Sequence, residues 1–127
     1  MHYHKKKIYY HDTDCGGVVY YANYLKYLEE ARTEFFAQRG STIKDLADRG
    51  TLFVVGKVEI SYRAAARYGD EIEVCTRVEK VRSASLVFYQ EIKRTGVLLI
   101  ECRTQLVCID EKMSPRLMPA ELKESFK

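Results

Sequence analysis

The hydrophobic period changes along the chain, and this change constrains the fold more than any other feature of the sequence. In residues 21–39, apolar side chains recur every three or four positions, which predicts one long amphipathic helix ending at Gly40. From residue 53 onward the period is two, which is typical of half-buried strands. Since one amphipathic helix must bury its apolar face, the sequence predicts an α+β domain with the helix packed on an antiparallel sheet.

Four stretches alternate in this way, and turn-forming residues separate them. They span residues 53–62, 71–78, 86–92 and 98–108. Their spacing suits consecutive antiparallel hairpins. Shorter elements complete the expected order: a first strand over residues 5–10, a second helix from Ser41 or Thr42 to about Asp48, closed by Gly50, and a C-terminal helix from about residue 120.

The alternation also assigns strand residues to two faces of the sheet. The helix-facing side should carry Val54, Val58, Ile72, Val74, Leu86, Phe88, Leu98 and Ile100. The opposite side should carry Val87, Tyr89, Val97, Leu99, Val107 and Ile109. This second set is more apolar than a solvated face requires, which predicts contacts with other copies of the chain.

Size and composition indicate the class of protein. With 127 residues, 46% of them hydrophobic and 31% charged, the chain is expected to form a single globular domain over residues 1–127. No apolar run approaches the roughly 20 residues of a membrane span, and the N-terminus lacks a signal-peptide pattern, so a cytoplasmic location is expected. The formal net charge of +3 suits an anionic small ligand and is too weak to favour nucleic acid.

The loop over residues 11–17 is where the chemistry is expected. It is polar, it ends in two glycines, and its Asp14 precedes the start of the long helix by a few residues. Unpaired N–H groups at a helix start carry a partial charge of about +0.5, so they can polarise a carbonyl while Asp14 acts as base or nucleophile. The same pattern also fits an aspartate that only forms a turn or a cap.

Several segments carry the motif of one known family. In order, they are Tyr10-x-x-Thr13-Asp14-x-x-Gly17-x-Val19-Tyr20-Tyr21-x-Asn23-Tyr24, Glu30-Ala31-Arg32-x-Glu34, Gly40, Phe53-Val54-Val55, Tyr62-x-x-x-Ala66-Arg67-x-x-Asp70, Ser85-Leu86-Val87-Phe88 and Arg116-x-x-Pro119. Over nearly its whole length the chain resembles the 4-hydroxybenzoyl-CoA thioesterase family, and within it the bacterial acyl-CoA thioester hydrolases encoded beside the Tol–Pal envelope system. It departs from the pattern at Ala65, where close relatives often carry proline.

This resemblance implies a hotdog fold, in which a long antiparallel sheet wraps around one central helix. It also implies an enzyme that hydrolyses the thioester of acyl-CoA to free acid and CoA, with no cofactor. The ligand-type residues His11, Asp12, Asp14 and Cys15 are too crowded for ordinary zinc spacing, so no metal is expected. Family members form dimers, usually paired into tetramers, and hold acyl-CoA between protomers. Acyl-carrier protein is an alternative carrier of the acyl group, and the acyl chain length stays open.

The resemblance also assigns roles to individual residues. It places the catalytic aspartate at Asp14, as nucleophile or general base, and the polarising backbone N–H at Tyr21. Substrate contacts are expected from Tyr10, His11, Gly17, Val19 and Tyr24. The CoA phosphates are expected at Arg82, with Ser83 and Ser85 beside it, and Lys80, Arg63 and Arg67 are further basic candidates.

The same residues also allow other interpretations. Asp12 could be the acid, His11 a general base, and Glu30 or Glu34 the helix carboxylate that a sister group uses. The cysteines Cys15, Cys75, Cys102 and Cys108 form no C-x-x-C pair, so reduced thiols are favoured over a zinc or redox site. From a different class, the chain could be an acyl-CoA or acyl-carrier-protein binding partner in lipid or envelope metabolism with little turnover.

Overall fold

The computed structural model describes residues 1–126 and contains one sheet with helices on one side. The elements are β1 (His2–Lys7), the 3-10 turn η1 (Tyr10–Asp12), α1 (Asn23–Gln38), α2 (Ile43–Asp48), β2 (Leu52–Tyr62), β3 (Glu71–Val81), β4 (Ser85–Arg94), β5 (Val97–Ile109) and α3 (Ala120–Glu124). The five strands run in the order β1-β3-β4-β5-β2, and every neighbouring pair is antiparallel. The predicted α+β class and the element order are therefore confirmed.

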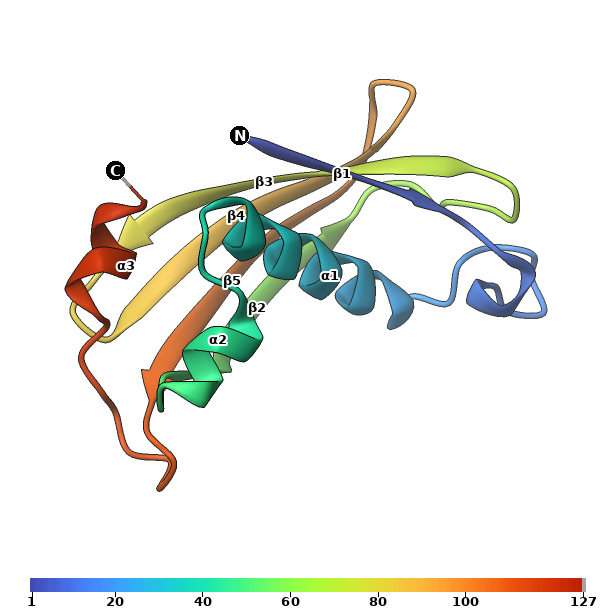
Figure 1. Ribbon diagram of the computed structural model, residues 1–127. Helices are drawn as coiled ribbons and strands as arrows, with labels where there is room; N and C mark the ends of the chain where they lie inside the picture. Colours follow the sequence, from blue (N-terminus) through green and yellow to red (C-terminus); the bar gives the residue numbers. More distant parts are fainter. Residues whose placement is uncertain (127) are drawn as a thin grey trace.

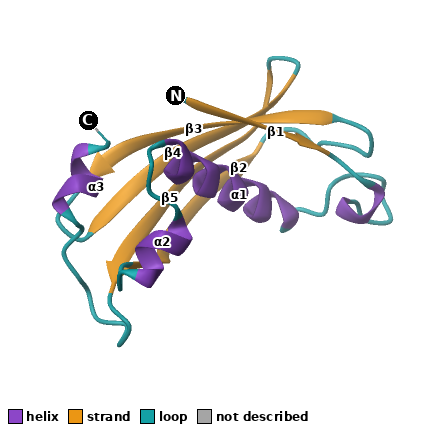
Figure 2. Cartoon of the chain, viewed as in Figure 1, coloured by secondary structure: helices purple, strands orange, loops and turns teal. Residues whose placement is uncertain are grey.

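The sheet curves around α1, which crosses its concave side (Figure 1). Figure 2 shows the helices gathered on that side, with the convex face left to the strands. The buried side of α1 includes Tyr27, Leu28, Ala31 and Phe35, each at most 2% exposed. These residues recur every three or four positions. The apolar face predicted from the sequence is therefore the face of α1 that packs on the sheet.

The first strand and the start of α1 were predicted a few residues from their true places. The strand covers His2–Lys7 rather than residues 5–10, and it pairs with β3 from His2 opposite Thr76 to Lys7 opposite Glu71. The chain then turns at η1, and α1 begins at Asn23. Side chains of β1 alternate between half-buried and exposed positions. The sequence did not predict this strand correctly because its lysines are all charged, so the alternation in burial is not matched by an alternation in hydrophobicity.

The face assignments of Val54, Leu98 and Leu99 were wrong because β-bulges shift the alternation. In β2 the register shifts between Val55 and Lys57, so Val54 pairs with Val107 on the outer face while Phe53 and Val55 face α1. In β5 the residue Leu99 has no partner in the ladder, and Leu98 pairs with Lys93 on the outer face. One inserted residue reverses every later side chain of a strand, and period-two counting cannot detect it.

The bulge also buries Leu99, which the sequence assigned to the outer face, and Ile109 is buried at the end of β5 next to Pro115. The rest of the outer face carries ordered charges. Arg103 donates twice to the Glu79 carboxylate, at 2.9 and 3.0 Å. The guanidinium groups of Arg77 and Arg103 lie over the Tyr89 ring, at 4.6 and 4.8 Å from its centre. Contact between copies on this face stays a prediction.

No helix among residues 1–126 combines the length and hydropathy that crossing a membrane requires. All four cysteines are free, and only Cys15 is exposed.

Candidate active site

The loop that carries Asp14 is a tight turn fixed by backbone bonds. The Asp14 N–H donates to the Val18 carbonyl at 2.9 Å, and the Gly17 N–H donates to the Asp14 carbonyl at 3.1 Å. Closing this turn places Gly17 at φ 79°, in the left-handed region that favours glycine. The Asp14 carboxylate accepts the Gly16 N–H at 2.7 Å and is otherwise exposed. The turn therefore holds a carboxylate in a fixed direction and leaves it open to a ligand.

The start of α1 offers backbone donors beside this carboxylate. The N-cap residue Ala22 has a helical backbone, and no side chain caps the helix. Among residues 1–126, no acceptor is bound to the N–H groups of Tyr21 and Ala22. Uncapped N–H groups at a helix start can bind an oxyanion or polarise a carbonyl oxygen. The predicted donor at Tyr21 is thus available in the structure.

Asp12 joins the loop to the helix start. Its carbonyl accepts the Tyr20 N–H at 3.0 Å and the Asn23 side-chain amide at 2.9 Å. Its carboxylate accepts the Tyr9 N–H at 2.8 Å. The residue is only 6% exposed and does not line the cleft that holds Asp14, so the structure favours a structural role over a catalytic one.

The electrostatic surroundings of Asp12 keep it ionised. Burial alone would raise the pKa of this carboxyl, but the Tyr9 N–H, the neighbouring Tyr27 hydroxyl and the Lys6 charge hold the pKa below its ordinary value. Burial in turn raises the pKa of the Tyr27 hydroxyl. A charged, buried carboxylate accepting a backbone N–H is a strong local anchor.

A cleft of about 360 Å³ opens between this loop, the helix start and the segment after β2. Its lining residues are Asp14, Val18, Val19, Tyr21, Tyr24, Tyr62, Arg63, Ala64 and Ala65. Four predicted site residues, namely Asp14, Val19, Tyr21 and Tyr24, therefore meet in one place. Gly17 belongs to the same turn. The cleft joins a carboxylate to free backbone donors over largely apolar walls.

Tyr24 contributes more to the walls than to the opening. It is 3% exposed, and its hydroxyl accepts the Ala66 N–H at 2.9 Å. The Ala66 carbonyl in turn accepts the Val19 N–H at 2.9 Å. Tyr24 thus ties α1 to the segment between β2 and β3, which forms the opposite wall of the cleft.

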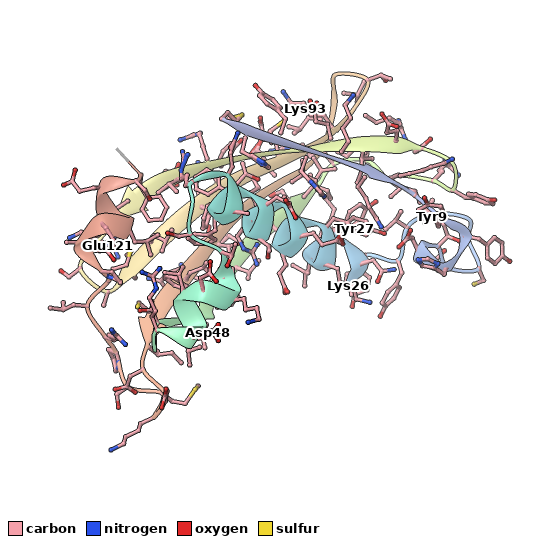
Figure 3. All side chains as sticks on the ribbon, viewed as in Figure 1. Tyr9, Lys26, Tyr27, Asp48, Lys93 and Glu121 are labelled. Carbon is pink, nitrogen blue, oxygen red and sulfur yellow. The ribbon has the colours of Figure 1, made fainter. Side chains whose placement is uncertain are left out.

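Tyr10 and His11 lie outside this cleft. Both belong to η1, where the Tyr10 ring packs edge-on against Tyr68 and the His11 ring stacks on Tyr9. The His11 Nε2 atom lies 3.7 Å from the Asp12 carboxylate. Figure 3 shows Tyr9 in this region, beyond the N-terminal end of α1. Within one chain the two residues border the loop and do not face Asp14.

Arg82, Ser83 and Ser85 lie at the opposite end of the sheet. Arg82 and Ser83 lie in the turn between β3 and β4, and Ser85 begins β4; the Met118 N–H donates to the Ser83 carbonyl at 2.9 Å. In Figure 1 this turn lies beside α3, whereas the η1 loop lies at the other end. Within one chain the structure does not bring Arg82 to Asp14. Arg82 instead lines a hollow of about 450 Å³ that also includes Lys57, Lys80 and Arg103.

Sequence reasoning missed the wall formed by Tyr62 and Ala64 and the joining role of Asp12. Tyr62 and Asn23 both stood in the motif that carried the resemblance, so a signal for them was present. Ala64 and the backbone N–H groups that donate to Asp12 could not be recognised from side-chain type, because their roles depend on where the chain turns.

The fold and the cleft together define a class of protein. An antiparallel five-stranded sheet wrapped around one long helix, with a carboxylate loop at the helix start, is a hotdog fold.

Comparison with known proteins then identifies the family. The model of the Thioesterase-like superfamily matches residues 9–126. The acyl-CoA thioester hydrolase YbgC of Escherichia coli O6:H1 is 40% identical over 123 residues, covering 95% of this chain and 92% of that protein. A hypothetical protein from Thermus thermophilus superposes with a TM-score of 0.95 at 32% identity, covering 99% of this chain and 97% of the other. The chain belongs to the Thioesterase-like superfamily, which confirms the resemblance stated from the motifs.

A further solved structure supports the same family. The probable thioesterase from Bartonella henselae has a TM-score of 0.90 at 30% identity, covering 93% of this chain and 98% of the other.

Proposed function

We propose that the protein hydrolyses acyl-CoA thioesters to a free acid and CoA in the Asp14 cleft. The observation that carries this proposal is the meeting, on one cleft, of the Asp14 carboxylate and the unbonded N–H groups at the start of α1. The 40% identity with an acyl-CoA thioester hydrolase of matching length supports the same substrate class.

In this proposal the thioester carbonyl oxygen points at the backbone N–H of Tyr21. A negative charge develops on that oxygen in the transition state, and a fixed donor of this kind contributes about 10²–10³ in rate. Asp14 acts in one of two ways. It attacks the carbonyl carbon, expelling the CoA thiolate and leaving a mixed anhydride that water cleaves, or it takes a proton from the attacking water.

A single-turnover reaction in heavy-oxygen water separates these routes. The nucleophilic route puts label into the Asp14 carboxylate when water attacks the anhydride at the carbonyl carbon of Asp14, so label on Asp14 excludes a pure general-base route. The general-base route leaves Asp14 unlabelled and puts all of the label into the released acid.

We propose further that the working unit is a homo-oligomer, a dimer or a dimer of dimers. The strand β2 is an edge of the sheet, and its side chains Val55, Val58 and Tyr62 are exposed. Antiparallel pairing of two β2 edges about a twofold axis sets the Tyr62 end of one strand beside the Leu52 end of the other. Leu52 lies at the same end of the sheet as the Arg82 turn.

This pairing gives a role to the residues that one chain keeps apart. The CoA portion of a substrate in the Asp14 cleft of one copy would extend toward Arg82, Ser83 and Ser85 of a second copy. Phosphates bind well to arginine and hydroxyl donors, so the basic turn suits them. Tyr10 and His11 would border the approach to the cleft.

We place the enzyme in the cytoplasm, acting in lipid metabolism, with acyl-carrier protein as a second possible acyl donor. Its free cysteines fit a reducing compartment.

The test is thiol release from short-chain, long-chain and aromatic acyl-CoA thioesters by the wild type and by Asp14→Ala. We expect release by the wild type and almost none by the variant. Tight binding of acyl-CoA by both proteins, with release by neither, would instead support the alternative of a binding partner with little turnover.

A further inference from the structure

Arg32 of α1 is a buried cation without a carboxylate partner. It is 8% exposed, and among residues 1–126 no carboxylate oxygen lies within 4.0 Å of its guanidinium. Burial lowers its pKa. Burying an unpaired charge is costly, so such a residue is usually neutralised by something that binds beside it.

A neutral network holds the guanidinium in place. Arg32 donates one hydrogen bond to the side-chain oxygen of Gln90, at 3.2 Å. The Gln90 amide nitrogen donates to the Leu28 carbonyl and to the Thr76 hydroxyl, both at 3.0 Å. The amide is therefore fixed with its oxygen toward Arg32. A guanidinium has five N–H donors, and one hydrogen bond from Arg32 is seen within residues 1–126, so its other donors are open to a ligand.

Arg32 lines a pocket of about 210 Å³ between α1 and β2. Its other lining residues are Glu29, Thr33, Phe36, Ile43, Phe53, Val55 and Leu106. The walls are mostly aliphatic and aromatic, and Arg32 is the cation among them. Glu29 is exposed, and its charge raises the Arg32 pKa without an ion pair between the two side chains within residues 1–126.

We propose that this pocket binds a carboxylate carried on an apolar body. The planar fork of a guanidinium matches the two oxygens of a carboxylate, and the apolar walls match a hydrocarbon chain. The pocket and the Asp14 cleft lie along the same helix. Arg32 is about 14 Å beyond Asn23, the first residue of α1, at a rise of about 1.5 Å per residue.

This chemistry has two possible sources. The carboxylate is either the far end of an acyl chain whose thioester occupies the Asp14 cleft, or a separate fatty acid. Only the first source rests on the proposed function.

The primary test is calorimetric titration of the full-length wild type with octanoate and, as the uncharged match, with octanamide. We expect octanoate to bind at least about tenfold more tightly, because hydrogen bonds to charged groups are among the stronger ones. Equal affinity for the two compounds would overturn the proposal, and this comparison needs no variant to fold.

Variants then test whether Arg32 causes the preference for octanoate over octanamide. Arg32→Gln should abolish it and Arg32→Lys should keep part of it. The matched control is Lys26→Gln, which removes one positive charge from the same helix on its solvent side (Figure 3). Loss of the preference in Lys26→Gln as well would show attraction to overall charge and would contradict the proposal.

Sedimentation of the same proteins tests the competing occupant. If a carboxylate of a second copy neutralises Arg32, then Arg32→Gln will sediment as a smaller species and the wild type will show no preference for octanoate. That combination would overturn the proposal.

The source is decided by comparing hydrolysis of tetradecanedioyl-CoA with that of tetradecanoyl-CoA, whose extended chains match the separation along α1. A wild-type preference for tetradecanedioyl-CoA that Arg32→Gln loses would assign the pocket to the far end of the acyl chain. Octanoate binding without this preference would assign it to a separate acid. Failure to cleave either ester would contradict the proposed function and leave the titration to decide the pocket.

Discussion

At the scale of single residues, the candidate site depends on a turn that only a few side chains allow. Asp14 points from a loop in which Gly17 has a left-handed backbone, and the loop is fastened to α1 through the carbonyl of Asp12. The identity of Asp14 and the donor at Tyr21 could be predicted from the motif. The hydrogen bonds that join the loop to α1 could not be predicted, because they use the backbone carbonyl of Asp12 and every residue has such a carbonyl.

Gly17→Ala should lower kcat, because a Cβ at φ 79° costs about 1–2 kcal/mol and displaces the Asp14 turn. Gly40→Ala is the matched control. Gly40 has φ 84°, has open space around its Cα like Gly17, and ends α1 far from the cleft. Thermal melts should show a similar loss of stability in both variants. Equal kcat values in the two variants would contradict this role for the turn.

Asp12 makes stability depend on pH. A carboxyl whose pKa is lower in the folded state stabilises the fold above its ordinary value of 3.8, and this contribution is lost as the pH falls through the folded value. Asp12→Asn should therefore be less stable than the wild type at neutral pH, by about 1.5–3 kcal/mol. The difference should narrow below pH 3.8 in denaturant titrations.

The control for Asp12→Asn is Asp48→Asn, which changes an exposed carboxylate on α2. A stability difference for Asp12→Asn that stays constant from neutral to acid pH would exclude the charged anchor.

At the scale of elements, the sequence pattern predicted the strands and the helix but not their exact faces. Alternation identified all of β2 to β5, because each strand buries one side. The bulges at Gly56 and Leu99 reversed the faces around Val54 and Leu98. A bulge is set by how two strands pair, so a single strand's sequence does not record it.

Tyr24 connects two elements, and Tyr24→Phe tests that connection. The Ala66 N–H, in a fully buried residue, would lose its acceptor, at a cost of about 1–3 kcal/mol. The wall of the cleft between β2 and β3 should loosen, which hydrogen exchange at Ala66 would detect. Tyr3→Phe, at an exposed tyrosine of β1, is the control and should change neither quantity.

At the scale of the whole molecule, the proposed substrate site is shared between two copies of the chain. One chain keeps the basic turn at Arg82 and the cleft at Asp14 on opposite ends of its sheet, and pairing through β2 would bring them together. The family resemblance implied an oligomer, but the residues that would join the copies depend on which edge of the sheet stays open.

Val58→Lys should therefore weaken self-association and lower kcat/KM, since Val58 is exposed on the open edge strand. Tyr3→Lys places the same charge at an exposed position on the opposite edge strand, β1. Sedimentation velocity should show a smaller species for Val58→Lys. A monomeric Val58→Lys with unchanged kcat/KM would contradict the shared site.

The most direct test of the central claim is single-turnover cleavage of octanoyl-CoA by the wild type, Asp14→Asn and Asp48→Asn. Asp14→Asn keeps the shape of the side chain and removes its negative charge, while Asp48→Asn makes the same change on the exposed side of α2 (Figure 3). We predict that Asp14→Asn still binds octanoyl-CoA but cleaves it at least about a hundredfold more slowly than the wild type. Asp48→Asn should cleave it at the wild-type rate. A wild-type rate in Asp14→Asn would contradict the account.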